Sequence, residues 1–447
     1  MGSCLDVKYS SNGPILSMNW RRIDLLGPIS LLDGFSCPLL LSFPYMNPLN
    51  LFRPILKIVR SYRHRYTPLV EVAIFQKHLL HNLEAYRVAS QLPVAPVLKS
   101  NAYGHGLLEV AGVLAGAPVP VPFMVVDSYH EALILRNEGI TTPLLIIGFS
   151  ANENIVRNRL KNVAFTISSM EQLRALAPTL ARPTTLHIKI DTGMHRQGIH
   201  PKELDEALTL ACETKDEDGR QLLRLEGICS HLSDGDNDDT DFTKKQIILW
   251  NSLATSVKEK QKASPSAFAH LAYFHLSASS GLFHAGTIQA NVMRLGLGLY
   301  GIPANAPRDA RLGLKAVLEM TSLISSVKKV PRGALIGYND TFEAPKDMTI
   351  ATIPAGYNEG IDRRLSNEGT VKVAQFVCRI VGRVSMNITT IDISHLPAHL
   401  MKIGTPVTLI SADPRDANSI LQMADRANAS PYELLVHIPE GLRRVVK

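Results

Sequence analysis

Between residues 66 and 312, short apolar runs alternate with segments whose apolar residues recur at helical spacing. Phe75, Leu79 and Leu83 mark the first of these helical segments. The apolar runs predict eight short buried strands: Val94–Leu98, Phe123–Asp127, Leu144–Ile147, Val163–Ile167, Leu186–Ile190, Leu225–His231, Ala272–Leu276 and Asn291–Gly296. Eight short strands alternating with helices over about 250 residues are typical of a (β/α)8 barrel.

After residue 312 the pattern changes to short β-branched segments punctuated by glycines, with no long helix between them. Met348–Pro354, Val371–Val377 and Arg379–Met386 are examples of such segments. They predict a β-rich second domain. The expected fold class is therefore α/β, with a (β/α)8 TIM-type barrel over 66–312 and a C-terminal β domain over 313–447.

Residues 1–65 do not share this regularity. The richest apolar stretch, 34–52, is interrupted by prolines and has no clean run of about 18 apolar residues, which argues against a membrane span. Asp24 and Asp33 make a secretory signal a poor match. The excess of arginine over acidic residues is compatible with a transit peptide. We favour a poorly ordered extension, or a start codon placed too early.

Composition and charge exclude several classes of protein. The 447 residues are 45% hydrophobic and 19% charged, which is too apolar for a disordered chain. Residues 1–65 hold eight Lys or Arg against three Asp, so the remaining 39 basic and 37 acidic side chains nearly balance. A nucleic-acid-binding surface is therefore not expected. The five cysteines include no CxxC pair, which argues against a disulfide scaffold or a zinc ribbon and favours a reducing compartment.

The predicted strands of the barrel end in residues that can carry chemistry, where barrel active sites lie. Lys99 closes the first run, Lys189 lies near the end of the fifth, and His231 ends the sixth. A serine-rich loop with Ser279 follows the seventh, and the eighth holds Arg294. A lysine at a strand end is usually a solvated surface charge. Lys99 differs because it directly follows an apolar run, where an ammonium group must be paired, desolvated or covalently engaged.

An amine held in this way is suited to form a Schiff base. The serine-rich loop, followed by Arg294 and its neighbouring glycine, can offer hydroxyl and backbone N–H groups to a phosphate. A Schiff-base lysine beside a phosphate cup suggests pyridoxal phosphate, although spacing alone supports this only weakly.

Several blocks of the sequence resemble the alanine racemase family. The run 97–106, VLKSNAYGHG, is similar to the pyridoxal phosphate lysine signature of that family. Further similar blocks follow in the family's order: Lys189–Gly198, Gly227–Asp236, Met293–Gly301, Gly337–Phe342, Thr352–Gly369, Val381–Asn387, Ser430–Glu433 and Arg443–Val445. The resemblance covers residues 66–447 and leaves 1–65 without a counterpart. It implies pyridoxal 5'-phosphate as the cofactor and the interconversion of L-alanine and D-alanine as the activity.

The resemblance implies two catalytic bases on opposite faces of the cofactor. Lys99 would form the Schiff base and act as one base, and Tyr338 in the second domain would be the other. In this family the tyrosine reaches the site from the partner subunit, so a homodimer with two shared sites is expected. His231 would hydrogen-bond Tyr338.

The resemblance also implies residues that bind the cofactor and the substrate. The residues expected to hold the phosphate are Tyr103, Ser279, Gly296, Leu297 and Tyr432. Arg294 would face the pyridine nitrogen. Arg196 would help to bind cofactor and substrate, and Lys189, which is carbamylated in many members, would orient it. Tyr357 would narrow the substrate entrance, and the backbone of Met386 would contact the substrate carboxylate.

The chemistry of racemisation explains this set of residues. A proton must leave one face of Cα while another arrives on the opposite face, and two bases do this without moving the substrate. Tyrosine has an ordinary pKa of about 10, so it needs cationic or hydrogen-bonding neighbours to act near pH 7. His231 and Arg196 would supply them. An arginine in place of a carboxylate at the pyridine nitrogen weakens the electron sink, which we expect to favour reprotonation over transamination.

The chain departs from the family pattern at Asn387, where Asp is usual, and at Ala278, where Asn is usual. Neither change removes a base, although a reduced rate or a shifted pH optimum would be consistent with them. A related decarboxylase would place an acid at the pyridine nitrogen and a cysteine in its second domain, whereas Cys378 lies in a strand-like run. A barrel-only pyridoxal phosphate-binding protein would lack Tyr338. A racemase for a larger amino acid stays open as an alternative.

The resemblance further implies a cytoplasmic enzyme that supplies D-alanine for peptidoglycan. Its partners would be a small amino acid and a second copy of the chain. We expect no bound metal, no nucleic acid and no membrane.

Overall fold

The computed structural model describes residues 66–235, 240–276, 279, 286–304 and 309–447, with four strand residues near the amino terminus. Met1–Thr67 form a unit of their own. Its described part is the antiparallel pair of β1 (Tyr9–Ser10) and β2 (Gly13–Pro14). The expectation of a poorly ordered extension over 1–65 therefore falls almost entirely outside the described residues. The second unit, Pro68–Lys447, carries the fold.

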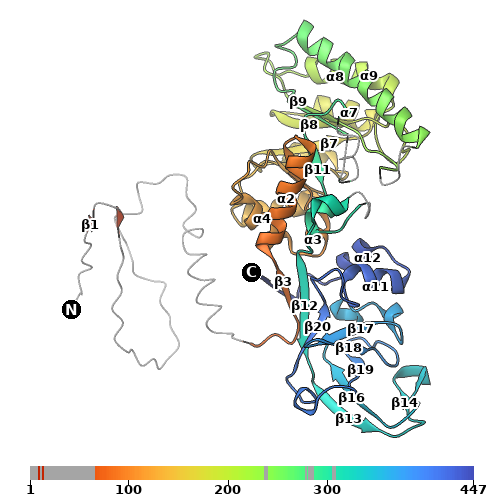
Figure 1. Cartoon of the computed structure of the whole chain (residues 1–447). Helices are drawn as coiled ribbons and strands as arrows, with labels where there is room; N and C mark the ends of the chain where they lie inside the picture. The colour runs from red at the N-terminus through yellow and green to blue at the C-terminus, as the bar shows by residue number, and fades with distance from the viewer. Residues whose placement is uncertain are drawn as a thin grey trace, which may run out of the picture. The chain divides into compact units, whose positions relative to one another are not determined.

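The eight predicted barrel strands are all present, and the ladders between them are parallel. Figure 1 labels several of these strands. They are β4 (Val94–Pro96), β5 (Met124–Val126), β6 (Leu144–Ile146), β7 (Val163–Ile167), β8 (Thr184–Lys189), β9 (Leu223–Cys229), β10 (Tyr273–His275) and β11 (Met293–Leu295). Strands β5 to β10 form one sheet in chain order, and β11 pairs with β4. Backbone N–H groups close the ring on both sides, from Leu98 to the carbonyl of Val125 at 2.7 Å and from Asn291 to that of Phe274 at 3.0 Å. The predicted (β/α)8 fold is confirmed.

A helix precedes the first of these strands, and helices fill the connections from β4 to β10, as the periodicity predicted. They are α2 (Gln76–Ser90), α3 (Lys99–Tyr103), α4 (Leu107–Ala115), α5 (Tyr129–Asn137), α6 (Asn152–Arg157), α7 (Met170–Leu176), α8 (Leu204–Glu213) and α9 (Asp241–Ala263). Hydroxyl side chains begin several of them: Ser128 accepts from the Glu131 N–H and Ser169 from the Gln172 N–H. Inside the ring, a compact apolar cluster that includes Phe123, Val125 and Ala164 closes the interior.

The second domain is rich in β-structure, as predicted. Its largest sheet has the order β18-β17-β20-β12-β3-β21. These strands are β3 (Glu71–Ile74), β12 (Leu318–Leu323), β17 (Thr370–Val373), β18 (Phe376–Arg379), β20 (Pro406–Ile410) and β21 (Arg443–Val446). The smaller sheets contain β13 (Ser326–Val330), β16 (Met348–Ile353) and β19 (Thr389–Asp392), and the hairpin β14 (Leu335–Ile336) and β15 (Phe342–Glu343). Two helices complete the domain, α11 (Ile420–Ala427) and α12 (Pro431–Val436).

Strand β3 was not foreseen in this sheet. It precedes the barrel in the chain, within the segment that the sequence pattern placed in the barrel, yet it pairs antiparallel with β12 and parallel with β21. The periodicity of a short apolar strand does not indicate which sheet the strand joins, so the sequence pattern could not predict this long-range pairing.

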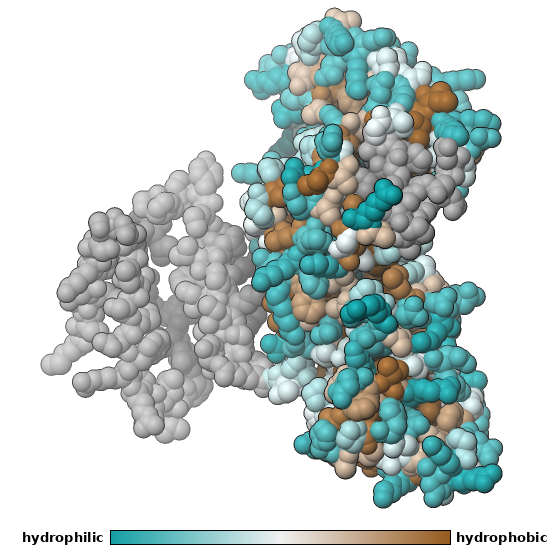
Figure 2. Space-filling view, viewed as in Figure 1, coloured by the Kyte–Doolittle hydropathy of each residue, from teal (hydrophilic) through white to brown (hydrophobic). Residues whose placement is uncertain are grey.

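Cys378 is fully buried in β18, in agreement with its expected place in the core. No helix within the described residues is long and apolar enough to cross a membrane. Figure 2 shows hydrophobic residues scattered in small groups among polar ones over the visible face.

Candidate active site

Two hydroxyl groups and two backbone N–H groups meet at the carboxyl ends of β4 and β11. The N–H groups of Gly296 and Gly298 donate to Ser279 Oγ at 3.1 and 3.4 Å. A Cβ atom added at Gly296 would lie 3.1 Å from Tyr103 Oη, so only glycine leaves this space open. Hydroxyls and backbone N–H groups around a small space form a cradle suited to an anion such as a phosphate.

Tyr103 is a neutral donor in this cradle at ordinary pH. Burial raises its pKa to about 12, and the charges of Tyr432 and Asp127 act in the same direction. Tyr432, in the first turn of α12, is 47% exposed. Leu297 follows Gly296 directly and begins the 3-10 turn Leu297–Tyr300. The structure thus brings the predicted phosphate-binding residues to one place.

Arg294 is buried on β11 and is held on several sides. Its Nη2 donates to the carbonyls of Ser230 at 2.7 Å and Leu276 at 3.0 Å, and lies 3.3 Å from His231 Nδ1. Its Nη1 donates to the carbonyl of His275 at 3.0 Å. Burial lowers the pKa of this guanidinium, which nevertheless stays cationic at neutral pH. None of these partners is a carboxylate.

A group of cations surrounds His231. Burial, aided by those neighbours, lowers the pKa of His231 to about 3, so its ring is neutral at physiological pH. The cations, in order of effect, are Arg294, Lys189, Arg196 and Lys99. Lys99 and Lys189 are half-buried, and Arg196 is exposed. Burial also lowers the pKa of Lys189. This concentration of positive charge suits a ligand with phosphate and carboxylate groups.

Lys99 is followed by a turn of left-handed helix. Ser100, Asn101, Ala102 and Tyr103 have φ of 56, 55, 52 and 52°. None is a glycine, and each such residue costs roughly 1–2 kcal/mol. Strain of this kind persists only where the surroundings impose it, and it is common at functional sites. Here it directs Tyr103 into the phosphate cradle.

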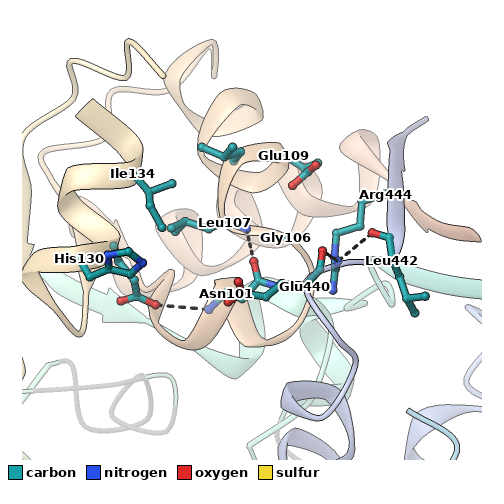
Figure 3. A pocket seen from close by; sticks show the side chains of 11 residues that line it. Asn101, Gly106, Leu107, Glu109, His130, Ile134, Glu440, Leu442 and Arg444 are labelled. Atoms are coloured by element: carbon teal, nitrogen blue, oxygen red, sulfur yellow. Dashed lines mark hydrogen bonds between the residues drawn. The ribbon is translucent and has the colours of Figure 1, made fainter. Parts of the chain in front are cut away.

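Contacts from three parts of the chain hold this turn. The carboxylate of Glu131 accepts the N–H of Asn101 at 3.3 Å, and the Asn101 side-chain oxygen accepts the N–H of Leu107 at 2.8 Å. Arg444 of β21 donates to the carbonyl of Gly104 from Nη2 at 2.8 Å. Figure 3 shows Asn101, Gly106 and Arg444 around one hollow. That hollow is lined by none of the four cations around His231, so we assign it to the support of the turn.

Three of the predicted residues of the second domain are exposed to solvent in the single chain. Tyr338 is 67% exposed, Met386 55% and Tyr357 43%. The loops that carry Tyr357 and Met386 are joined, because the Asn358 N–H donates to the Met386 carbonyl at 2.9 Å. Among the described residues, no hydrogen bond joins Tyr338 to His231, which contacts Arg294 instead.

Sequence reasoning missed His187 and His275, which are fully buried inside the barrel. His275 hydrogen-bonds Arg294, and His187 hydrogen-bonds His275. A signal was present, because each histidine occupies a position between apolar residues of a short strand. Ser277 and Ala278 of the serine-rich loop lie outside the described residues. The departure from the family pattern at Ala278 therefore lies outside them too.

Comparison with known families gives two matches that together span most of the chain. The N-terminal domain of alanine racemase matches residues 74–304, and its C-terminal domain matches residues 317–446. An alanine racemase of Fusobacterium nucleatum is 31% identical over 381 residues, covering 84% of this chain and 99% of the relative. One of Leptospira interrogans is 30% identical over 404 residues, covering 86% of this chain and 97% of the relative.

Solved structures give the same result. An alanine racemase of Clostridium difficile 630 superposes with a TM-score of 0.75 at 26% identity, covering 86% of this chain and 97% of the other. The structure of alanine racemase from Bacillus anthracis with bound L-Ala-P gives 0.74 at 26% identity, covering 86% and 96%.

Proposed function

The chain belongs to the alanine racemase family of pyridoxal phosphate-dependent isomerases, and from this premise we propose that it interconverts L-alanine and D-alanine. The observation that carries the proposal is the grouping of Lys99, Arg294 and His231 beside the cradle of Tyr103 and Ser279. Relatives named as alanine racemases support alanine over a larger amino acid as substrate.

The residues present fit pyridoxal phosphate. The cradle at Gly296 has the hydroxyl and backbone N–H donors that a phosphate group needs, with Tyr103, Ser279, Leu297 and Tyr432 around it. Lys99 would bind the cofactor covalently, and Arg294 would donate to its ring nitrogen. When bound, the cofactor would supply an electron sink that makes the Cα proton of an amino acid acidic.

Two residues would move protons at Cα. Lys99 Nζ would take or give the proton on one face, and Tyr338 Oη on the other. Burial favours the neutral amine of Lys189, and a neutral amine can react with carbon dioxide. We therefore propose that Lys189 is carbamylated. The carbamate would hold Arg196, which would bind the substrate carboxylate together with the Met386 backbone, with Tyr357 at the entrance.

We propose that Tyr338 acts on the site of a second copy of the chain. Its exposure in the single chain supports this, as does that of Tyr357 and Met386. The resulting homodimer would hold two shared sites, each built from one barrel (66–312) and one partner C-terminal domain (313–447). The product would serve peptidoglycan synthesis in the cytoplasm.

Deuterium exchange at Cα tests the proposal. Purified protein with pyridoxal phosphate is mixed with L-alanine in D2O and followed by NMR. We expect D-alanine that carries deuterium at Cα, and loss of this product in Lys99→Ala and Tyr338→Phe. Exchange without inversion would show that Lys99 works and Tyr338 does not. Absence of exchange with alanine, despite a bound cofactor, would contradict the proposed substrate.

A further inference from the structure

Four polar side chains form a continuous hydrogen-bonded chain through the interior of the barrel. Glu226 Oε2 lies 3.2 Å from His187 Nε2, and His187 Nδ1 lies 2.8 Å from His275 Nε2. His275 Nδ1 is in turn bonded to Arg294 Nη1. This series of hydrogen bonds begins at the buried guanidinium of Arg294 and ends at the carboxylate of Glu226, whose side chain is 37% exposed.

The barrel is shaped to hold these rings. A Cβ atom at Gly227 would lie 2.5 Å from His187 Nδ1, so only glycine leaves room for the imidazole against β9. The register of β8 and β9 shifts beside His187, where Glu226 is the extra residue of β9. The rings of Tyr273 and Phe123 flank His187 at centroid distances of 6.0 and 5.7 Å. The apolar walls exclude water from the two histidines.

Arg294 and Glu226, at the two ends of this series of hydrogen bonds, impose the same direction of donation on it. Arginine has only donors, so His275 Nδ1 must accept and its proton must be on Nε2. His187 Nδ1 then accepts, which places the His187 proton on Nε2, facing Glu226. An ionised carboxylate can only accept, so the pattern closes without conflict. Burial lowers the pKa of both histidines, in agreement with neutral rings.

These hydrogen bonds also link the positive charge of Arg294 to the negative charge of Glu226. The groups that contact Arg294 directly are carbonyls and imidazoles. An uncompensated buried cation is costly, and aligned hydrogen bonds in a low dielectric polarise one another. Glu226 is the carboxylate at the far end of this alignment.

We propose that Glu226, through His187 and His275, is a positioning residue that fixes the donor orientation of Arg294. Removing the carboxylate would leave the buried His187 Nε2–H without its acceptor and only Arg294 to hold the tautomers, so the pattern of both imidazoles could reverse. His275 would then present Nδ1–H to a guanidinium N–H, and Arg294 would have to move. We call the hydrogen bonds from Glu226 through His187 and His275 to Arg294 the histidine relay. The relay does not depend on a bound cofactor, whereas its effect on pyridoxal phosphate binding rests on the proposed function.

The tautomers are measured first, by nitrogen NMR of histidine-labelled protein without cofactor at pH 7. His187→Asn and His275→Asn assign the two rings. We expect both to be neutral and protonated at Nε2. Glu226→Leu should move the His187 proton to Nδ1, whereas Glu226→Gln, whose amide oxygen can accept, should keep the pattern. Glu217→Leu, at an exposed turn, is the matched control and should change nothing.

Two NMR results would overturn the proposal: a proton on Nδ1 of His275 in the unmodified protein, or unchanged rings in Glu226→Leu. Circular dichroism establishes that each variant is folded before its rings are interpreted.

Cofactor affinity is the second measurement, by spectroscopic titration with pyridoxal phosphate. We expect Glu226→Leu to raise Kd about tenfold, the scale of one hydrogen bond to a charged group, with little change in Glu217→Leu. Wild-type affinity in Glu226→Leu would contradict the positioning of Arg294. If the unmodified protein itself does not bind pyridoxal phosphate, the proposed function fails, and the histidine tautomers alone decide whether the relay exists.

Discussion

Buried histidines near the site are held neutral by their surroundings. His105 Nδ1–H donates to the carbonyls of Ala102 and Tyr103, and the ring packs on Tyr300 with a centroid distance of 4.4 Å. Burial dominates these contacts and lowers its pKa to about 4. No composition or spacing rule predicts this shift, because burial is set by the fold around the residue.

We predict that His105 makes the protein sensitive to mild acid. Its pKa is near 6.5 when unfolded and about 4 when folded, so the unfolded chain binds more protons between these values. The stability is complete above pH 6.5 and declines as the pH falls toward 4. His105 should account for about 2 kcal/mol of the unfolding free energy that urea unfolding shows to be lost between pH 7.5 and pH 5. His105→Asn is expected to be less stable at pH 7.5 but to lose less on acidification, and an unchanged pH slope would contradict this.

Asn387 illustrates how far sequence alone could go with single residues. The sequence shows that Asn387 replaces the family's usual Asp, but it does not show which residue the Asn387 side chain contacts. The Asn387 side-chain amide donates to Glu359 Oε1 at 2.8 Å, and Glu359 also accepts the Gly356 N–H at 2.8 Å. A carboxylate at 387 would oppose Glu359, so the amide suits this acidic neighbour. The partner was unpredictable because 28 positions separate it from Asn387.

The left-handed turn after β4 is imposed by other elements rather than by its own residues. Its sequence, Ser-Asn-Ala-Tyr, contains no glycine and gave no sign of positive φ, although Asn tolerates this region. Glu131 at the start of α5 and Arg444 of β21 supply the contacts that hold it. Periodicity could predict the strand and the helix on either side, whereas contacts across hundreds of residues shape the connection.

We predict that Arg444→Ala loosens this turn. Arg444 donates to the carbonyl of Gly104 and to those of Pro439 and Leu442, so its loss leaves several acceptors unpaired. The expected cost is about 2 kcal/mol of unfolding free energy, with weaker pyridoxal phosphate binding because Tyr103 moves. Thermal unfolding and cofactor titration measure both effects. Arg443→Ala, at the exposed neighbouring position, is the control, and equal effects in the two variants would contradict the proposed role.

At the scale of the whole molecule, the sequence predicted two domains but not how they assemble. Eight apolar runs were sufficient for the barrel, because its strands pair in chain order. The second domain recruits β3 from before the barrel, a pairing that no local pattern reports. Likewise, no hydrogen bond joins Tyr338 to His231 among the described residues, and the partner subunit that would complete the proposed site is implied by family resemblance alone.

We predict that two inactive variants restore activity to each other. If Lys99 and Tyr338 of each site come from different copies, a mixed dimer of Lys99→Ala and Tyr338→Phe has one intact site. Random mixing by co-refolding gives half mixed dimers, so about a quarter of the wild-type activity is expected. Unmixed samples serve as controls. If both residues came from one chain, the mixture would stay inactive.

The pairing of β3 with β21 also sets the order in which the chain can finish folding during synthesis. Glu71 pairs with Arg443, so the first strand of the second unit must wait until residues about 370 positions further along the chain have been made. At the usual ribosomal rate of about 5–20 residues per second, the ~370 intervening residues take roughly 20–75 s. During that interval the barrel can close, while β3 offers an open edge to other nascent chains or to a chaperone. Synthesis of β21 ends this interval, because β21 then pairs with the open edge of β3 and brings Arg444 to the turn that follows Lys99.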